Sequence, residues 1–403
     1  MTAIPHTLTV PRVPPAWRLL IVGTILVCGT VTLPQRVGFG GVSGLGALTI
    51  VWCLAAWGLW APRPWLPGEL RGPLLPLVLF TICTLGSMLW YPPAVKGLQV
   101  VAVGVGFLGL LLLTGRHVEE SRELAAAIHR ALDVAAAFSA VVYATSTVFF
   151  GMGAEDFILA RPFALFAMLG VARQLSRWQA GERGGLLFAS LLTAAVFLSV
   201  SRTALVACLA LFPLAAMIRG DRRSVVATAW FTAVAAAALL AAVFLSDTMY
   251  ERFFGFDATL TVGGVNINAS GRRAMWELLV ERSWDHPLFG HGIGASSVLV
   301  DNTFVNLGHP HNDFLRFLYD LGLVGLGLWL VFLGLTCLYL WPRAVRLARR
   351  NDPRLPYVLT PLLALLAVSA SMFTDNSAGY VFVMAPLGIL LGCAFGVLRR
   401  GVE

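Results

Sequence analysis

Residues 321–341 read LGLVGLGLWLVFLGLTCLYLW, a continuous apolar run that contains no charged side chain. A helix must present about 20 consecutive, mostly apolar residues to cross the hydrocarbon core of a lipid bilayer. Stretches of the same kind recur along the chain, and they predict twelve membrane-spanning helices. The predicted spans are approximately residues 17–33, 42–60, 73–90, 97–114, 125–150, 157–173, 186–200, 203–218, 225–245, 321–341, 356–373 and 379–398.

The composition agrees with a membrane protein. Of the 403 residues, 58% are hydrophobic and only 12% are charged, and the mean hydropathy is +0.79. Soluble proteins carry about 25% charged residues, so this chain lacks the charge that would cover a water-facing surface. The composition excludes a disordered chain, a collagen-like fibre and a soluble enzyme, and it predicts an all-α polytopic membrane protein.

The stretch 186–218 contains Ser201 and Arg202 near its middle. A single helix of this length would overshoot the bilayer, and an arginine at bilayer depth is costly. We therefore predict two spans that are joined by a tight turn on the extracytoplasmic side.

The basic residues predict the orientation, because cytoplasmic loops carry an excess of Lys and Arg. With the N-terminus in the cytoplasm, the cytoplasmic segments hold 20 of the 29 basic residues and the opposite side holds 9. Both termini are then cytoplasmic. The basic residues are scattered between apolar runs instead of gathering on one soluble face, which argues against nucleic-acid binding.

One long loop, residues 246–320, separates the first nine predicted spans from the last three. It holds five of the nine outer basic residues, four of the seven His and nine of the 21 acidic residues. Loops of this length usually have a function. The chain is therefore divided into membrane helices over 1–245, a long outer loop with short helices over 246–320, and membrane helices over 321–403.

Several sequence signals of cofactor chemistry are absent. The chain has no Walker A sequence, no Gly-rich nucleotide fingerprint after a strand and no paired His at metal-ligand spacing. The six Cys each lie within an apolar run, which favours neither disulfides nor metal ligation. The run Gly290-His-Gly-Ile-Gly294 is interpreted as a tight turn. We predict no metal and no cofactor.

Three features of the outer side could support chemistry. Arg202 lies at the outer end of a predicted helix, where the alternative is that its side chain merely reaches the lipid headgroups. Arg272 and Arg273 follow Ser270-Gly271, a predicted helix start, so that backbone N–H groups and guanidiniums would form an anion site there; the alternative is a solvated pair of charges.

The third feature is the sequence His309-Pro-His-Asn-Asp-Phe-Leu315. A neutral imidazole near the membrane surface can accept a proton at physiological pH. For His309, which precedes a proline, we favour a structural role, whereas His311 stands where a new helix begins and is the candidate base. Because no nucleotide is available outside, a substrate for this site must arrive already activated and membrane-bound, as a lipid pyrophosphate does.

The order of these motifs resembles that of the O-antigen ligases. The sequence contains Ser-Arg-Thr-Ala-Leu at 201–205, Ser-Gly-Arg at 270–272, His-Pro-Leu-Phe-Gly-x-Gly at 286–292, and His311, Asn312, Leu315 and Gly322 in the final motif. O-antigen polymerases and bacterial protein O-oligosaccharyltransferases belong to the same superfamily. The resemblance covers roughly residues 190–330 by motif.

The resemblance implies a GT-C-type glycosyltransferase that acts on the periplasmic face of the bacterial inner membrane. Such an enzyme transfers a glycan from undecaprenyl pyrophosphate to the lipid A-core, without metal or cofactor and with inversion. It implies that Arg202 and Arg272 bind the donor pyrophosphate and that His311 activates the acceptor hydroxyl. Candidates for supporting roles are Arg273, Arg161, Lys96 and His309, although the segment around Arg161 departs from the family pattern.

Other functions remain open on the sequence. A polymerase would use the same donor but a second lipid-linked glycan as acceptor, and a protein O-oligosaccharyltransferase would use a protein. A transporter of lipid-linked glycans would be expected to carry charged residues in mid-membrane and paired broken helices. The predicted spans are nearly free of charge, which disfavours transport.

Overall fold

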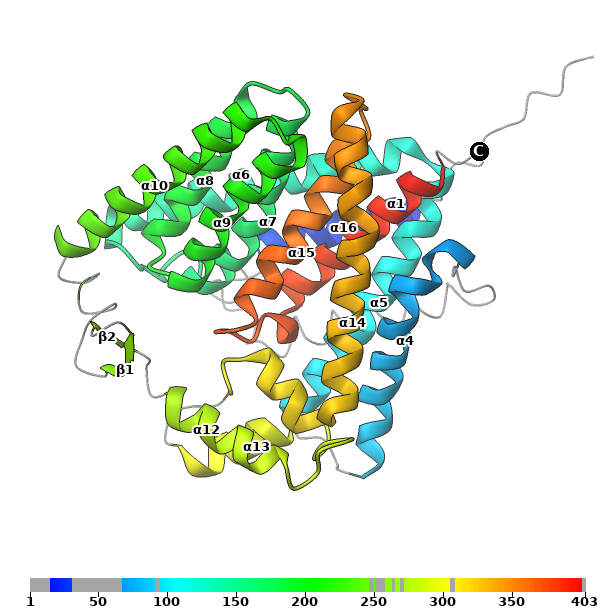
Figure 1. Cartoon of the computed structure of the whole chain (residues 1–403), viewed down its shortest axis with the longest axis vertical. Helices are drawn as coiled ribbons and strands as arrows, with labels where there is room; N and C mark the ends of the chain where they lie inside the picture. Colours follow the sequence, from blue (N-terminus) through cyan, green and yellow to red (C-terminus); the bar gives the residue numbers. More distant parts are fainter. Residues whose placement is uncertain are drawn as a thin grey trace, which may run out of the picture.

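The computed structural model describes residues 15–30, 67–90, 95–245, 250, 258–262, 265–268, 272–304 and 309–400. Over these residues the protein is a bundle of helices, with a smaller group of elements at one end (Figure 1). The α-helices are α1 (Pro15–Gly29), α4 (Arg71–Gly86), α5 (Val95–Glu120), α6 (Arg122–Phe150), α7 (Ala160–Gln179), α8 (Gly184–Leu198), α9 (Arg202–Arg219), α10 (Arg222–Leu245), α12 (Arg272–Ser283), α13 (Ala295–Thr303), α14 (Asp313–Arg349), α15 (Leu355–Ser371) and α16 (Val381–Arg399).

The predicted spans coincide with helices wherever the structure describes them, and the predicted span 42–60 lies outside the described residues. Among the described residues, six helices are long and apolar enough to cross a membrane. They are Gly68–Leu89, Lys96–Glu120, Arg122–Phe150, Arg202–Arg219, Asp313–Arg349 and Val381–Arg399. The protein is therefore an α-helical polytopic membrane protein, whereas the total of twelve spans stays a prediction.

Helix α7 shows how charge is accommodated inside the bundle. Most of its side chains are buried, although it carries Arg161, Arg173 and Arg177. The guanidinium of Arg173 forms an ion pair with Asp133 of α6 at 3.2 Å. A buried charge must be paired to offset its desolvation. The pair with Asp133 therefore allows Arg173 to be buried when α7 packs inside the bundle.

Helix α16 packs closely against α5 because three glycines recur along one of its faces. A Cβ atom at Gly388 would lie 2.7 Å from the carbonyl oxygen of Phe107, and one at Gly396 would lie 2.5 Å from that of Gly115. Gly392 stands between them and meets the α5 backbone in the same way. Small residues at this spacing let helix backbones approach in membranes.

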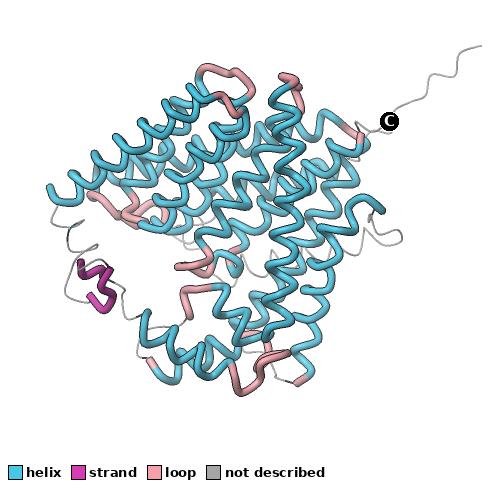
Figure 2. The backbone as a smooth tube through the Cα atoms, viewed as in Figure 1, coloured by secondary structure: helices cyan, strands magenta, loops and turns pink. Residues whose placement is uncertain are grey.

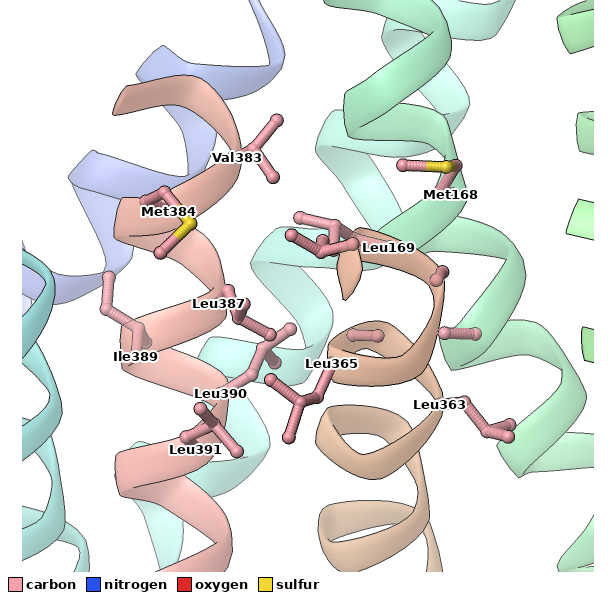
Figure 3. Close-up of a cluster of buried hydrophobic side chains, with 14 of the residues drawn as sticks. Met168, Leu169, Leu363, Leu365, Val383, Met384, Leu387, Ile389, Leu390 and Leu391 are labelled. Carbon is pink, nitrogen blue, oxygen red and sulfur yellow. The ribbon is translucent and has the colours of Figure 1, made fainter. Parts of the chain in front are cut away.

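The other side of α16 packs into the apolar core. Figure 3 shows Leu387, Leu390 and Leu391 of α16 clustered with Leu365 of α15 and Leu169 of α7. All five side chains are fully or almost fully buried. These three helices pack against one another in the apolar core.

Helix α14 begins at Asp313, next to His311 where a new helix was predicted, and it continues through the predicted membrane span 321–341. The side chain of Asn312 caps it by accepting a hydrogen bond from the backbone N–H of Leu315 at 3.0 Å, which stabilises a helix start. Gly322 interrupts the helix with φ +67° and ψ −167°. The break separates a short N-terminal piece from the apolar run that was predicted to span the membrane.

Within the predicted loop 246–320 the structure describes α12, α13 and two short strands, β1 (Ala258–Val262) and β2 (Val265–Asn268). The strands pair antiparallel and are a small addition to the described helices, so the structure agrees with the predicted all-α class. The sequence holds a signal for this hairpin, since Gly263-Gly264 separates two runs rich in β-branched residues. Figure 2 shows the hairpin in magenta, away from the main bundle.

Short 3-10 helices complete the described structure. They are η1 (Gly68–Leu70), η2 (Ser87–Leu89) and η3 (Ser377–Gly379). The last of them lies in the connection between α15 and α16, at the same end of the bundle as α12 and the start of α14 (Figure 1). The five described cysteines are free, and Cys53 lies outside the described residues.

Candidate functional site

A cavity of about 610 Å³ lies where several loops and helix starts meet at one end of the bundle. The segments that line it come from widely separated parts of the sequence. The lining residues are Glu155, Leu159, Ala160, Arg161, Pro162, Ser199, Val200, Ser201, Arg202, Thr203, Arg272, His311, Thr374, Asp375, Tyr380 and Phe382.

Three arginines line the cavity, and each stands in the first turn of a helix. Arg161 is the second residue of α7, Arg202 is the first residue of α9, and Arg272 is the first residue of α12. The N-terminus of a helix offers unpaired backbone N–H groups and the positive end of the helix dipole. Three guanidiniums and three helix starts in one cavity form an arrangement that favours an anionic ligand.

Arg272 is fixed by its surroundings. Its Nη1 atom donates a hydrogen bond to the carbonyl oxygen of Thr374 at 2.7 Å. Burial lowers the pKa of Arg272, and the positive charges of Arg161 and Arg202 lower that pKa further, against the opposing effect of Asp375. The three like charges repel one another, so a bound anion would relieve this repulsion.

Asp375 places one carboxylate among these arginines. Its Oδ2 atom lies 3.7 Å from Nε of Arg161, and its Oδ1 atom accepts hydrogen bonds from the backbone N–H of Asn376 at 2.8 Å and from the hydroxyl of Tyr380 at 3.4 Å. Asp375 is only 5% exposed. Its negative charge offsets part of the charge of Arg161 and also acts on Arg272, whose pKa it raises against the larger effect of burial.

The imidazole of His311 also lines the cavity. Burial lowers the pKa of His311 to about 3, and the nearby Arg272, Arg161 and His309 contribute to the lowering. The ring is therefore neutral at physiological pH and can accept a proton. Its Nδ1 atom is buried and has no hydrogen-bond partner among the described residues, so in this part of the structure no carboxylate orients the ring as in a catalytic triad.

The backbone holds His311 in place instead. His311 adopts φ +51°, in the left-handed region that residues with a side chain rarely occupy. On one side, Nε1 of Trp276 in α12 donates a hydrogen bond to the carbonyl oxygen of Pro310 at 2.9 Å. On the other side, the N–H of Asp313 donates to the carbonyl oxygen of Met372 at 2.8 Å. The chain is thus tied to other walls of the site both before and after His311.

A second strained residue lines the same cavity. Val200 has φ +56° in the turn between α8 and α9, a conformation that is especially unfavourable for a β-branched residue. Strained backbone of this kind tends to occur at functional sites. The turn at 199–201 also confirms the prediction that the stretch 186–218 is divided into two helices.

Three of the predicted supporting residues do not line the cavity. Arg273 points to the exposed face of α12 and pairs with Glu277 at 2.8 Å. Lys96 forms an ion pair with Asp301 of α13 at 2.6 Å. His309 is not among the lining residues; burial lowers its pKa to about 4, with Lys96 and Arg316 contributing.

The segment Gly290–Gly294 forms the predicted tight turn. Gly290, Gly292 and Gly294 all have positive φ, and the N–H of Gly292 donates to the carbonyl oxygen of Asp320 at 2.8 Å. The turn therefore docks on α14 next to the break at Gly322. It takes no part in lining the 610 Å³ cavity.

Sequence reasoning missed Asp375 and Tyr380. Both lie in the short connection 372–380 between two apolar spans, and none of the motifs extends that far. A usable signal was present, because Asp375 is the single acidic residue between positions 353 and 402. Among the described residues, no group of three or more His, Cys, Asp or Glu side chains is arranged to hold a metal ion.

The fold and the cavity together define an integral membrane protein with a cavity lined by three arginines at one end of its helical bundle. Residues 187–330 match the family model described as O-antigen ligase. The match covers nearly the same stretch, roughly residues 190–330, in which the ordered motifs resemble those of the O-antigen ligases. The matched region includes Arg202, Arg272 and His311, whereas Asp375 lies outside it. A comparison with curated proteins found no match.

Proposed function

We propose that this protein is an O-antigen ligase that transfers a glycan from undecaprenyl pyrophosphate to the lipid A-core. The family match supports the wider O-antigen ligase and polymerase superfamily. The observation that carries the finer proposal is the convergence of Arg202, Arg272 and His311 on one cavity, although they come from three separate parts of the chain. We further propose a GT-C-type fold and an active site on the periplasmic face of the bacterial inner membrane.

The proposed reaction is a single displacement at the anomeric carbon of the donor sugar. The acceptor hydroxyl oxygen forms the new bond to this carbon while the bond from the carbon to the pyrophosphate oxygen breaks. The electron pair of the broken bond leaves with undecaprenyl pyrophosphate. Nε2 of His311 takes the proton of the acceptor hydroxyl, and the product has the inverted configuration.

The arginines would stabilise the leaving group. Negative charge on the pyrophosphate grows as the bond breaks, and preorganised donors in a sheltered site stabilise such charge strongly. A guanidinium presents a planar fork that matches two phosphate oxygens at once. Arg202 and Arg272 would therefore do the work that a divalent cation performs in other pyrophosphate-dependent enzymes, and the proposal needs no metal or cofactor.

The low pKa of His311 fits this cycle. Burial and the nearby guanidiniums oppose protonation of the ring and so lower its pKa. A bound pyrophosphate brings negative charge close to the same arginines, and this charge raises the affinity of His311 for a proton. The base would thus become stronger when the donor is in place.

The test is the lipopolysaccharide profile of a strain that lacks this protein, complemented with wild type or with the Arg202→Ala variant. A ligase defect leaves bare lipid A-core while polymeric glycan accumulates on the carrier lipid. A polymerase defect leaves core that carries a single repeat unit, which would redirect the proposal to the polymerase. An unchanged profile in the deletion strain would refute both.

A further inference from the structure

A second cavity, of about 400 Å³, lies at the other end of the bundle, and we refer to it as the distal pocket. Its charged lining residues are Arg122, Arg354, Arg400 and Asp352, and Tyr357 contributes an aromatic ring to its lining. None of these residues takes part in the site described above.

The two cavities are separated by the length of a membrane span. Helix α16 has Phe382 of the first cavity at its start and is followed by Arg400 of the distal pocket. A helix of 19 residues is about 28 Å long at 1.5 Å per residue, close to the hydrocarbon thickness of a bilayer. The distal pocket therefore opens at the opposite membrane surface, which the distribution of basic residues predicts to be cytoplasmic.

The charge of the distal pocket is unbalanced. The guanidinium of Arg354 is bidentate to Asp352, with its Nη2 atom 2.8 Å from Oδ2, and this pairing lowers the pKa of the Asp352 carboxyl. Three arginines and one carboxylate leave two positive charges. Arg122 and Arg400 have no acidic partner within ion-pair distance among the described residues.

Arg400 gives the most specific indication of a ligand. Its Nη1 atom is buried and has no hydrogen-bond acceptor among the described residues. A desolvated guanidinium nitrogen without an acceptor is costly. An anionic oxygen in the distal pocket would satisfy this donor.

The rest of the distal pocket is apolar. Val118 of α5, Ala125 of α6 and Val397 of α16 line it beside Tyr357, whose ring packs edge-on against His129 at 4.7 Å between ring centroids. A soluble anion would gain nothing from this surface. A lipid would place its headgroup on the arginines and the first part of its chains on the apolar wall.

We propose that the distal pocket binds the phosphate of an anionic phospholipid from the leaflet opposite the active cavity. Basic pockets between membrane helices on the cytoplasmic side bind such headgroups in other proteins. The site involves neither the glycan donor nor the acceptor, so it is independent of the function proposed above.

The test is lipid retention by the purified full-length protein in native mass spectrometry, with phosphatidylglycerol against phosphatidylcholine as probes. The Arg122→Gln/Arg400→Gln variant is expected to bind phosphatidylglycerol at least roughly tenfold more weakly than wild type. The matched control is Arg346→Gln/Arg349→Gln, which removes two exposed charges from the last turn of α14. This control should retain wild-type binding.

Three results would overturn the proposal. The control could lose as much phosphatidylglycerol as the pocket variant, which would indicate unspecific attraction to basic loops. Inorganic phosphate at millimolar concentration could displace the lipid, which would indicate a site for soluble phosphate. The pocket variant could also bind like wild type. Equal thermal unfolding of both variants in phosphatidylcholine alone shows that a loss of binding is not a loss of fold.

Discussion

The carboxylate of Asp313 accepts a hydrogen bond from the backbone N–H of Ala378 at 2.7 Å. Asp313 is completely buried and stands two residues after His311. Ala378 belongs to η3, three residues after Asp375. Together with the bond from the N–H of Asp313 to the carbonyl oxygen of Met372, the Asp313–Ala378 hydrogen bond joins the segment that carries the candidate base to the loop that carries the carboxylate of the site.

Asp313 is also paired with Arg316, at 2.6 Å between Oδ1 and Nη2, and both side chains are almost fully buried. Asp313→Asn is expected to destabilise the protein by about 3–5 kcal/mol, because it leaves a buried guanidinium without a counter-charge. The double variant Asp313→Leu/Arg316→Met should recover a large part of this loss. Thermal unfolding in detergent measures both effects, and a double variant less stable than the single one would contradict the expectation.

Arg202 and Arg272 should not tolerate lysine. A point-like ammonium keeps the charge but cannot form two parallel hydrogen bonds to phosphate. We expect Arg202→Lys and Arg272→Lys each to lower ligation roughly 10- to 100-fold, the loss that accompanies a missing charge-assisted hydrogen bond. Arg273→Lys is the matched control, because Arg273 neighbours Arg272 yet lies outside the cavity. Equal losses of ligation in Arg272→Lys and Arg273→Lys would show that Arg272 has no specific role in the site.

Alanine variants of His311 and His309 should differ in their ligation rates. His311→Ala is expected to lower turnover about 10²- to 10⁴-fold, as loss of a general base does, while donor binding stays nearly intact. His309→Ala should have a milder effect because His309 does not line the cavity. Donor affinity measured beside the ligation rate decides the role. If His311→Ala loses donor binding as severely as the arginine variants, His311 contacts pyrophosphate and is not the base.

The pH dependence of ligation should report the charge around His311. Since the pKa of His311 is lowered to about 3, the ring stays neutral and kcat/KM should not fall between pH 8 and pH 5 through protonation of this residue. Arg272 contributes to the lowered pKa of His311. Arg272→Gln should therefore raise this pKa, and the fall of kcat/KM at low pH (the acid limb of the profile) should move to higher pH. Arg273→Gln should leave the limb in place. An acid limb that is identical in all three proteins would show that another group controls it.

The membrane helices could be predicted because their signal is local. In a lipid bilayer, a charge-free run such as 321–341 is stable only as a helix, because a helix satisfies all of its backbone hydrogen bonds within the segment. The break of α14 at Gly322 could not be found in this way, since it depends on long-range hydrogen bonds to the carbonyl oxygens of Pro287 and Leu288. The hairpin β1–β2 was missed because its strands are very short.

The site could be predicted only where motifs mark it. Arg202, Arg272 and His311 lie in sequence patterns that suggest their chemistry, and the structure brings them to one cavity. Arg161 departs from the family pattern, yet the packing of α7 carries it to the same cavity. Asp375 joins them through the α15–α16 connection, a long-range contact that no local pattern encodes.

Gly322 offers the sharpest test of how the fold supports the site. Its φ of +67° and ψ of −167° belong to a region that is essentially restricted to glycine, and a Cβ atom there would collide with the backbone carbonyl of Leu288. The N–H of Leu323 donates to the carbonyl oxygen of Pro287 at 2.8 Å, so the break in α14 also anchors the outer loop. Gly322→Ala is expected to destabilise the protein by about 2–5 kcal/mol, the sum of backbone strain and overpacking.

The matched control for Gly322 is Gly327→Ala in the same helix, where an added Cβ meets nothing within 4 Å. There alanine should be neutral or should stabilise the helix by up to about 1 kcal/mol, because it favours helical backbone more than glycine does. Thermal unfolding of both variants, followed by ligation assays on the folded protein, separates the two positions. If Gly322→Ala unfolds at the wild-type temperature, the break at Gly322 is not required, and the start of α14 can reach its place at the cavity through a continuous helix.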